Sequence, residues 1–209
     1  MLSLRKKVAR WIELITLFIG IPLLLDFNIL PVYKLVPLLA VFLFYLYILL
    51  RDKTFKRKQF RLNGFKAWIM ILWRSSIMLL FLLLFTWSVY PEQFLELPLH
   101  KPRIWLTLLI SYPFVSVIPQ EFVFRVYFYH RFTGLIGNRN ALILLNALLF
   151  SFSHIMFDNW VAPVFAFIAS ILFSLTYLRH RSFTIVVLEH AIYGLLIFTI
   201  GPGAFFYSF

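Results

Sequence analysis

Apolar stretches long enough to cross a bilayer follow one another along this 209-residue chain. A helix needs about 20 apolar residues for that, since the hydrocarbon core is about 30 Å thick. Stretches of this kind predict helices over residues 11–30, 33–50, 68–90, 104–129, 140–157, 160–178 and 182–200. Breaks fall at Pro31, Pro91, Pro102 and Gly201, and we expect the long fourth stretch to kink near Pro113 or Pro119. The expected fold is an all-α polytopic bundle of about seven transmembrane helices, in one domain over residues 1–209.

Composition agrees with a protein embedded in lipid. Hydrophobic residues make up 62% of the chain, whereas a soluble domain has about 45–50%. The sequence has no cysteine, which excludes disulfides, thiolate metal ligands and a cysteine nucleophile. A net charge of +12 would suggest nucleic acid in a soluble protein, but the basic residues here gather in short loops. We expect them to contact anionic membrane lipids, with no nucleic acid partner.

Two basic clusters set the expected topology. One precedes the first predicted helix and the other follows the second: Arg5, Lys6, Lys7 and Arg10, then Arg51, Lys53, Lys56, Arg57, Lys58 and Arg61. Cytoplasmic loops carry the excess of Lys and Arg in membrane proteins. We therefore expect both clusters, and with them the N-terminus, in the cytoplasm.

Ionisable residues inside the predicted helices are few. Those of the first half lie near predicted helix ends, where headgroups are within reach: Glu13, Asp26, Lys34 and Arg74. Those of the second half are Glu121, Arg125, His154, Glu189 and His190. A charge exposed to hydrocarbon is costly, so such residues usually face the protein interior or a water-filled cavity.

Glu121 and Arg125 are four residues apart, so they share one helical face and can pair. The pair alone fits a buried clamp as well as a functional site. The histidines His154 and His190, on two other predicted helices, favour a site. Glu121 and the two imidazoles would form a common zinc set with an open position for water. Without a metal, the same groups can activate water through the glutamate and stabilise an oxyanion through the histidines.

Three segments resemble, in order and rough spacing, the motifs of the CPBP intramembrane proteases, the Abi or CAAX-protease family. They are "QEFVFR", "FSFSH" and "EHAIYG". The family pattern is Glu-Glu-x-x-x-Arg, then Phe-x-x-x-His, then His-x-x-x-Asn or Asp. The positions that match it are Glu121, Arg125, Phe150, His154 and His190. The resemblance spans about residues 100–200 and implies a membrane helix bundle with a protease site within 104–200.

Two positions depart from that pattern. Gln120 stands at the first glutamate and Gly194 at the final Asn or Asp. The resemblance implies that, in the family, the first glutamate activates water and the final Asn or Asp assists the oxyanion. An amide does not accept a proton near neutral pH, and glycine has no side-chain donor. Glu121 can take over as base, whereas Glu189, adjacent to His190, points about 100° away from it on a helix.

These observations predict an intramembrane endopeptidase of a bacterial inner membrane, which cleaves a membrane-associated peptide or protein near the cytoplasmic leaflet. Glu121 would be the base or a ligand, Arg125 its orienter, and the histidines oxyanion donors or ligands of a divalent metal such as zinc. Gln120, Phe150, Glu189 and Gly194 are expected to support this site. The alternative is a non-catalytic member that acts in bacteriocin-type immunity or as a membrane scaffold. A transporter is disfavoured, because the sequence shows no repeats or broken helix pairs.

Overall fold

The computed structural model describes residues 3–29, 32–33, 35–55, 57–60 and 65–206. Pro31, Lys34, Lys56 and Arg61, which bear on the predicted spans and topology, lie outside these residues. The part of the chain that the structure describes is helical and contains no strand. Its α-helices are α1 (Leu4–Ile15), α2 (Ile21–Asp26), α3 (Leu35–Arg51), α4 (Phe65–Val89), α5 (Glu96–His100), α6 (Pro102–Tyr112), α7 (Ile118–Glu121), α8 (Phe128–Phe132), α9 (Arg139–Phe152), α10 (Val161–His180) and α11 (Phe183–Ile200).

Among the described residues, six helical stretches are long and apolar enough to cross a membrane. They are Leu4–Asp26, Lys66–Val89, Pro102–Phe132, Arg139–Phe157, Val161–His180 and Phe183–Ile200. The remaining predicted span, 33–50, corresponds to α3, which is shorter at 17 residues. The all-α polytopic bundle is confirmed. The first helix begins at Leu4 instead of residue 11, because lysine and arginine have good helix propensity and continue it.

The long fourth stretch changes its helical winding twice. A π-helical turn covers Pro113–Val117, four residues of α-helix follow as α7, and a second π-helical turn covers Phe122–Tyr127. Proline has no N–H to donate, which weakens the α-helical ladder where the first turn begins. π-helical turns often occur at functional sites, since each one shifts the side chains that follow it around the helix axis. Glu121 lies at the junction of α7 with the second turn.

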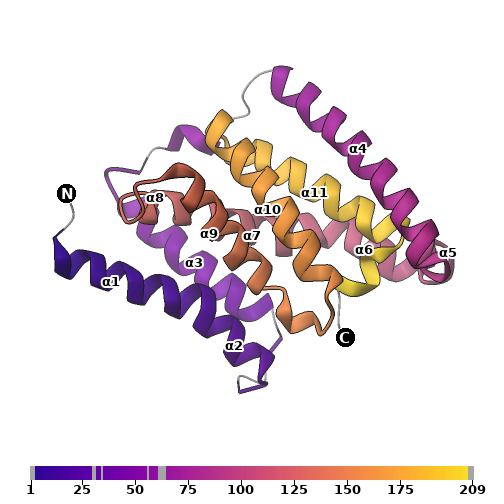
Figure 1. Cartoon of the computed structure of the whole chain (residues 1–209), viewed down its shortest axis with the longest axis horizontal. Coiled ribbons are helices and arrows are strands. Elements are labelled where there is room, and N and C mark those ends of the chain that lie inside the picture. Colours follow the sequence, from indigo (N-terminus) through magenta and orange to yellow (C-terminus); the bar gives the residue numbers. More distant parts are fainter. Residues whose placement is uncertain (1–2, 30–31, 34, 56, 61–64, 207–209) are drawn as a thin grey trace.

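Three helices of the C-terminal half form the framework of the bundle. α10 packs between α9 and α11, and α4 lies along the outer side of α11 (Figure 1). On the opposite side, α3 packs against the second π-helical turn, and the π-helical turn Thr16–Gly20 between α1 and α2 contacts α9. The second π-helical turn of the fourth stretch passes through the middle of this arrangement, and every residue from Phe122 to Tyr127 is buried.

Apolar side chains fill the centre and also cover the outside. The ring of Phe18 meets Phe124 edge-on with ring centres 5.0 Å apart, and Phe122 meets Phe42 at 5.1 Å. On α4, by contrast, Trp73 and Trp87 are 68% and 71% exposed. Large apolar surfaces left outside a bundle are what a lipid environment requires.

Glu13 ties the N-terminal helix to the rest of the bundle. Its carboxylate accepts a hydrogen bond from the Tyr127 hydroxyl and pairs with Arg131 at 2.8 Å. The sequence suggested a carboxylate reaching for headgroups, but its partners come from the end of the fourth stretch. These two partners lie 114 and 118 residues after Glu13, so the sequence alone does not reveal the contacts.

Candidate active site

The predicted pair of Glu121 and Arg125 forms in the structure. Arg125 Nε lies 3.2 Å from Glu121 Oε2, and both side chains are completely buried. An unpaired charge at such a place would have a large desolvation cost, so each residue of the pair needs the other.

Arg125 is held by further partners on neighbouring helices. Its Nη1 donates to Asn146 Oδ1 at 2.5 Å and its Nη2 donates to Ser170 Oγ at 3.1 Å. The guanidinium also lies over the rings of Phe150 and Phe173, 5.1 and 5.7 Å from their centres. Asn146 and Ser170 were missed by the sequence analysis, although an Asn in the middle of an apolar helix is a signal of an interhelical hydrogen bond.

The other oxygen of Glu121 orients His190. His190 Nδ1 lies 2.8 Å from Glu121 Oε1, and Nε2 lies 3.1 Å from the hydroxyl oxygen of Tyr112. Because Arg125 already balances the charge of Glu121, a neutral His190 leaves the group electrically neutral. The neutral ring then donates from Nδ1 to the carboxylate and accepts from the Tyr112 hydroxyl at Nε2. The ring also stacks on Phe173, with ring centres 4.6 Å apart.

His154 follows the end of α9 instead of lying inside a helix. It comes directly after the C-cap residue Ser153, in the turn before the short 3₁₀ segment Ile155–Phe157. Its Nδ1 is 2.8 Å from the carbonyl oxygen of Phe150, which can only accept. The proton of the neutral ring is therefore on Nδ1, and the lone pair of Nε2 remains for another partner.

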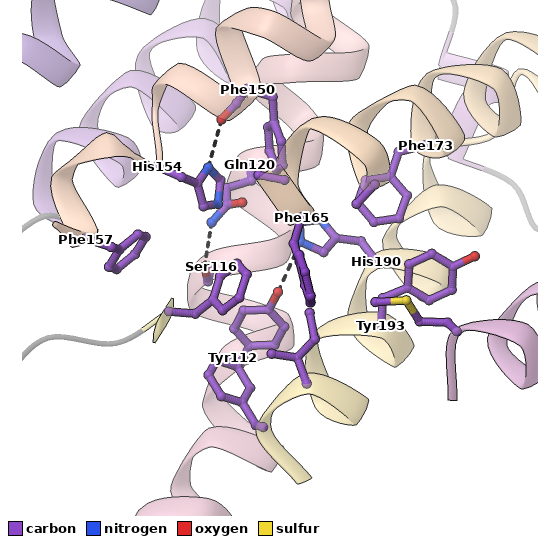
Figure 2. A pocket seen from close by; sticks show the side chains of 17 residues that line it. Tyr112, Ser116, Gln120, Phe150, His154, Phe157, Phe165, Phe173, His190 and Tyr193 are labelled. Carbon is purple, nitrogen blue, oxygen red and sulfur yellow. Dashed lines mark hydrogen bonds between the residues drawn. The ribbon is translucent and has the colours of Figure 1, made fainter. Parts of the chain in front are cut away.

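The two histidines line one pocket together with Tyr112, Ser116 and Gln120 (Figure 2). Its volume is about 70 Å³, which is room for a few water-sized groups. Glu121 is not among the lining residues, so it contacts His190 from behind. This arrangement differs from the expectation that Glu121 faces the reacting group as base or ligand.

Gln120 presents an amide to this pocket. Its Nε2 donates to Ser116 Oγ at 2.7 Å, one helical turn earlier. Its Oε1 is buried and makes no hydrogen bond within the part of the chain that the structure describes. A buried acceptor without a donor is costly, and a bound molecule with an N–H group can supply that donor.

A second, much larger cavity adjoins the pocket. Its volume is about 860 Å³, and most of its lining is apolar surface, with residues from the π-helical turn Thr16–Gly20, α2, α3 and α6. Tyr112, Ser116, Gln120 and His154 line both spaces, so the polar groups of the site stand at the boundary between them. A mostly apolar cavity with a few polar groups at one end is typical of a ligand site.

Gly194 lies where the ring of Tyr112 crosses α11. A Cβ at this position would lie 2.5 Å from Cζ of Tyr112, closer than real Cβ atoms approach a neighbour. Glycine at position 194 is therefore explained by sterics, because any side chain there would displace the tyrosine ring. Tyr112 was also missed by the sequence analysis, and no pattern around it singles it out.

Glu189 does not join the site. Its Oε1 pairs with Arg74 of α4 at 3.0 Å and accepts from the Tyr193 hydroxyl at 3.2 Å. Arg74 donates to Thr176 as well, at 2.9 Å. Adjacent residues on a helix point in different directions, and here His190 faces the pocket while Glu189 faces α4.

The donor atoms do not fit the predicted metal set. Both oxygens of Glu121 face Arg125 and His190, and both nitrogens of His190 are engaged by Glu121 and Tyr112. Of the three expected ligands, only His154 has an uncommitted donor atom, at Nε2. Within the described residues, no group of three His, Asp or Glu side chains is arranged to hold a metal ion.

One comparison with known proteins bears on this geometry. A family model described as type II CAAX prenyl endopeptidase Rce1-like matches residues 102–196. The region that carries the site is similar to this family. The match runs from the start of α6 into α11 and so includes every residue of the pocket's polar wall. Neither the curated proteins nor the solved structures gave a match.

Proposed function

We propose that this protein is an intramembrane endopeptidase in which His190, held by Glu121, activates water without a metal. The observation that carries the proposal is the chain of contacts from Arg125 through Glu121 to His190, which ends at the pocket. A carboxylate that holds one imidazole nitrogen and leaves the other toward a reacting group is the arrangement that serves general base catalysis.

The proposed step is ordinary amide hydrolysis. A water in the pocket donates one hydrogen bond to His154 Nε2 and, in place of the Tyr112 hydroxyl, the other to His190 Nε2, with its oxygen toward the scissile carbonyl carbon. His190 takes one proton as the C–O bond forms, and Glu121 stabilises the resulting imidazolium. The tetrahedral intermediate then collapses, the C–N bond breaks, and the proton passes to the leaving nitrogen. A peptide acid and a peptide amine are the products.

Gln120 fits this scheme as a group that binds backbone. Its unpartnered Oε1 can accept from a substrate N–H, as its Nε2 is turned toward Ser116. It replaces a carboxylate with a neutral amide, so the base function belongs to His190 in this protein. The larger cavity would take the apolar side chains next to the scissile bond.

The substrate that suits this site is a membrane-associated peptide or protein, cleaved near the cytoplasmic leaflet. The basic residues Arg5, Lys6 and Lys7 lie at the N-terminal end of α1, which favours that end in the cytoplasm. We propose a bacterial inner membrane as its location, with membrane lipids as its surroundings.

A second candidate function is capture of a peptide without cleavage, as in bacteriocin-type immunity or in a scaffold. Gln120 favours it, because an amide in place of a carboxylate binds backbone but provides no base of its own. This protein would then hold an intact peptide, and the peptide would copurify uncut.

Comparative membrane proteomics tests the proposal. Cells with the wild-type protein are compared with Glu121→Ala and His154→Ala cells at matched protein levels. We expect one membrane precursor to accumulate in both variants, and its product to disappear. Unchanged precursor levels in both variants would overturn the protease assignment. An intact peptide that copurifies with the wild-type protein would support capture instead.

A further inference from the structure

Tyr112 occupies the space that a side chain at position 194 would fill. Its Cζ lies 2.5 Å from the place of a Cβ on Gly194, and its Cε1 and hydroxyl oxygen lie nearer still. Tyr112 is the last residue of α6, whereas Gly194 lies within α11. The space beside α11 that a side chain at position 194 would take is thus filled by a side chain from α6.

The hydroxyl of Tyr112 carries the chemistry that glycine lacks. It lies 3.1 Å from His190 Nε2 (Figure 2). The side chain lines both the small pocket and the larger cavity. The ring is fixed edge-on against Phe198, with ring centres 5.0 Å apart. A held O–H group at the boundary of two cavities and beside the proposed base is placed to donate to a bound carbonyl.

We propose that the Tyr112 hydroxyl is the oxyanion donor of this enzyme, supplied from α6 in place of a donor on position 194. In the empty site it donates to His190 Nε2. When a substrate carbonyl binds, the hydroxyl donates to that oxygen and leaves Nε2 free for the water. Tyr112 keeps its proton throughout, so it adds no covalent step. This role rests on the proposed hydrolysis.

Tyr112→Phe is the first test, since phenylalanine keeps the ring against Gly194 and removes only the O–H. The wild type and the variant are compared on the precursor that accumulates in Glu121→Ala cells, in vesicles. We expect kcat to fall about 10²–10³-fold, the usual loss for one oxyanion donor, with KM changed less than about threefold. Tyr90→Phe removes a hydroxyl from a ring packed on Phe85 and Phe205, outside the pocket lining, and is the matched control.

Exchanging the two positions is the second test. Gly194→Asn alone collides with the ring, and Tyr112→Ala alone removes the donor and leaves a void. The double variant Tyr112→Ala/Gly194→Asn places a carboxamide donor in the vacated space. We expect its kcat to exceed that of both single variants, and its thermal midpoint in detergent to exceed that of Gly194→Asn. If the role of Tyr112 is purely structural, the double variant will recover the thermal midpoint without recovering kcat.

The outcomes separate this inference from the proposed hydrolysis. If the wild type cleaves the precursor and Tyr112→Phe does so with the same kcat, the donor role is wrong and the hydrolysis stands. If the wild type cleaves nothing and the thermal midpoints still show coupling between positions 112 and 194, the hydrolysis is wrong and the donor role falls with it. A kcat loss in Tyr112→Phe, with recovery in the double variant, supports both.

Discussion

Within the described residues, two completely buried carboxylates each pair with an arginine, and the two pairs differ in what lies beyond the carboxylate. Glu121 and Glu189 are both completely buried, and each pairs with an arginine, at 3.2 and 3.0 Å. The second oxygen of Glu121 holds His190, which opens onto the pocket. Glu189, although next to His190 in sequence, holds α4 against α11 through Arg74. The two carboxylates are equally buried and each pairs with an arginine, so what distinguishes them is the pocket-lining histidine that only Glu121 holds.

The largest expected effect is the difference in kcat between the same substitution made at Glu121 and at Glu189. Glu121→Gln should lower kcat about 10²–10⁴-fold, because a neutral amide neither orients His190 as a base nor stabilises its imidazolium. Glu189→Gln should leave kcat within about threefold, since it is outside the chain of contacts that ends at the pocket. Both are measured as initial rates on the accumulated precursor. Equal losses in the two variants would end the distinction between the pairs.

The next effect concerns stability. Glu189→Ala leaves Arg74 with its hydrogen bond to Thr176 but without its carboxylate at the contact of α4 with α11. We expect about 1–2 kcal/mol of destabilisation, less than for a fully buried pair, because 24% of the Arg74 side chain is exposed. Arg74→Met/Glu189→Met removes both charges and should recover most of that loss. The measurement is unfolding in detergent, with kcat per folded molecule as the second readout. A double variant as unstable as the single one would show that the pair is more than a neutralised clamp.

A surface carboxylate provides a reference for the buried ones. Asp52, just after α3, accepts from the Thr54 hydroxyl at 2.7 Å and backbone N–H at 2.8 Å, and its other oxygen lies 3.0 Å from His130 Nε2. Led by the Thr54 hydrogen bonds, these contacts lower the pKa of Asp52 to about 2. A lowered folded-state pKa stabilises the fold above the unfolded pKa of about 3.9, and the benefit is lost as pH falls through the folded value.

The expected signature of Asp52 is a small difference that depends on pH. Wild type should exceed Asp52→Asn in thermal midpoint by one or two degrees above about pH 4, and the two should converge as pH falls from about 4 to about 2. The activity at neutral pH should be the same in both. A difference that persists unchanged at pH 2 would contradict the assigned hydrogen bonds.

The smallest expected effect is that of metal removal. Because Glu121 and His190 are committed to each other, to Arg125 and to Tyr112, we expect a chelator to leave kcat unchanged. Purified protein is treated with EDTA and with 1,10-phenanthroline, and its metal content is measured alongside its rate. Loss of activity that returns with added zinc would show that Glu121 leaves His190 to bind a metal.

Much of the fold could be predicted from the lengths of the apolar stretches, and the pairing of Glu121 with Arg125 from their spacing. The apolar stretches predicted the helices because a bilayer needs about 20 apolar residues per crossing, wherever those helices pack. Glu121 and Arg125 were predicted to pair because helical geometry alone brings residues four apart together. Asn146, Ser170 and Tyr112 were missed, since their roles depend on which helices become neighbours.

The sequence by itself determined that this chain is a membrane bundle and that an ion pair and two histidines lie within it, because local periodicity and the cost of buried charge are properties of single segments. Only the tertiary structure decided what those residues face. It turned Glu121 away from the pocket toward His190, gave Glu189 to Arg74, and laid Tyr112 across Gly194. These contacts join residues 69 to 115 positions apart, and packing between helices sets them.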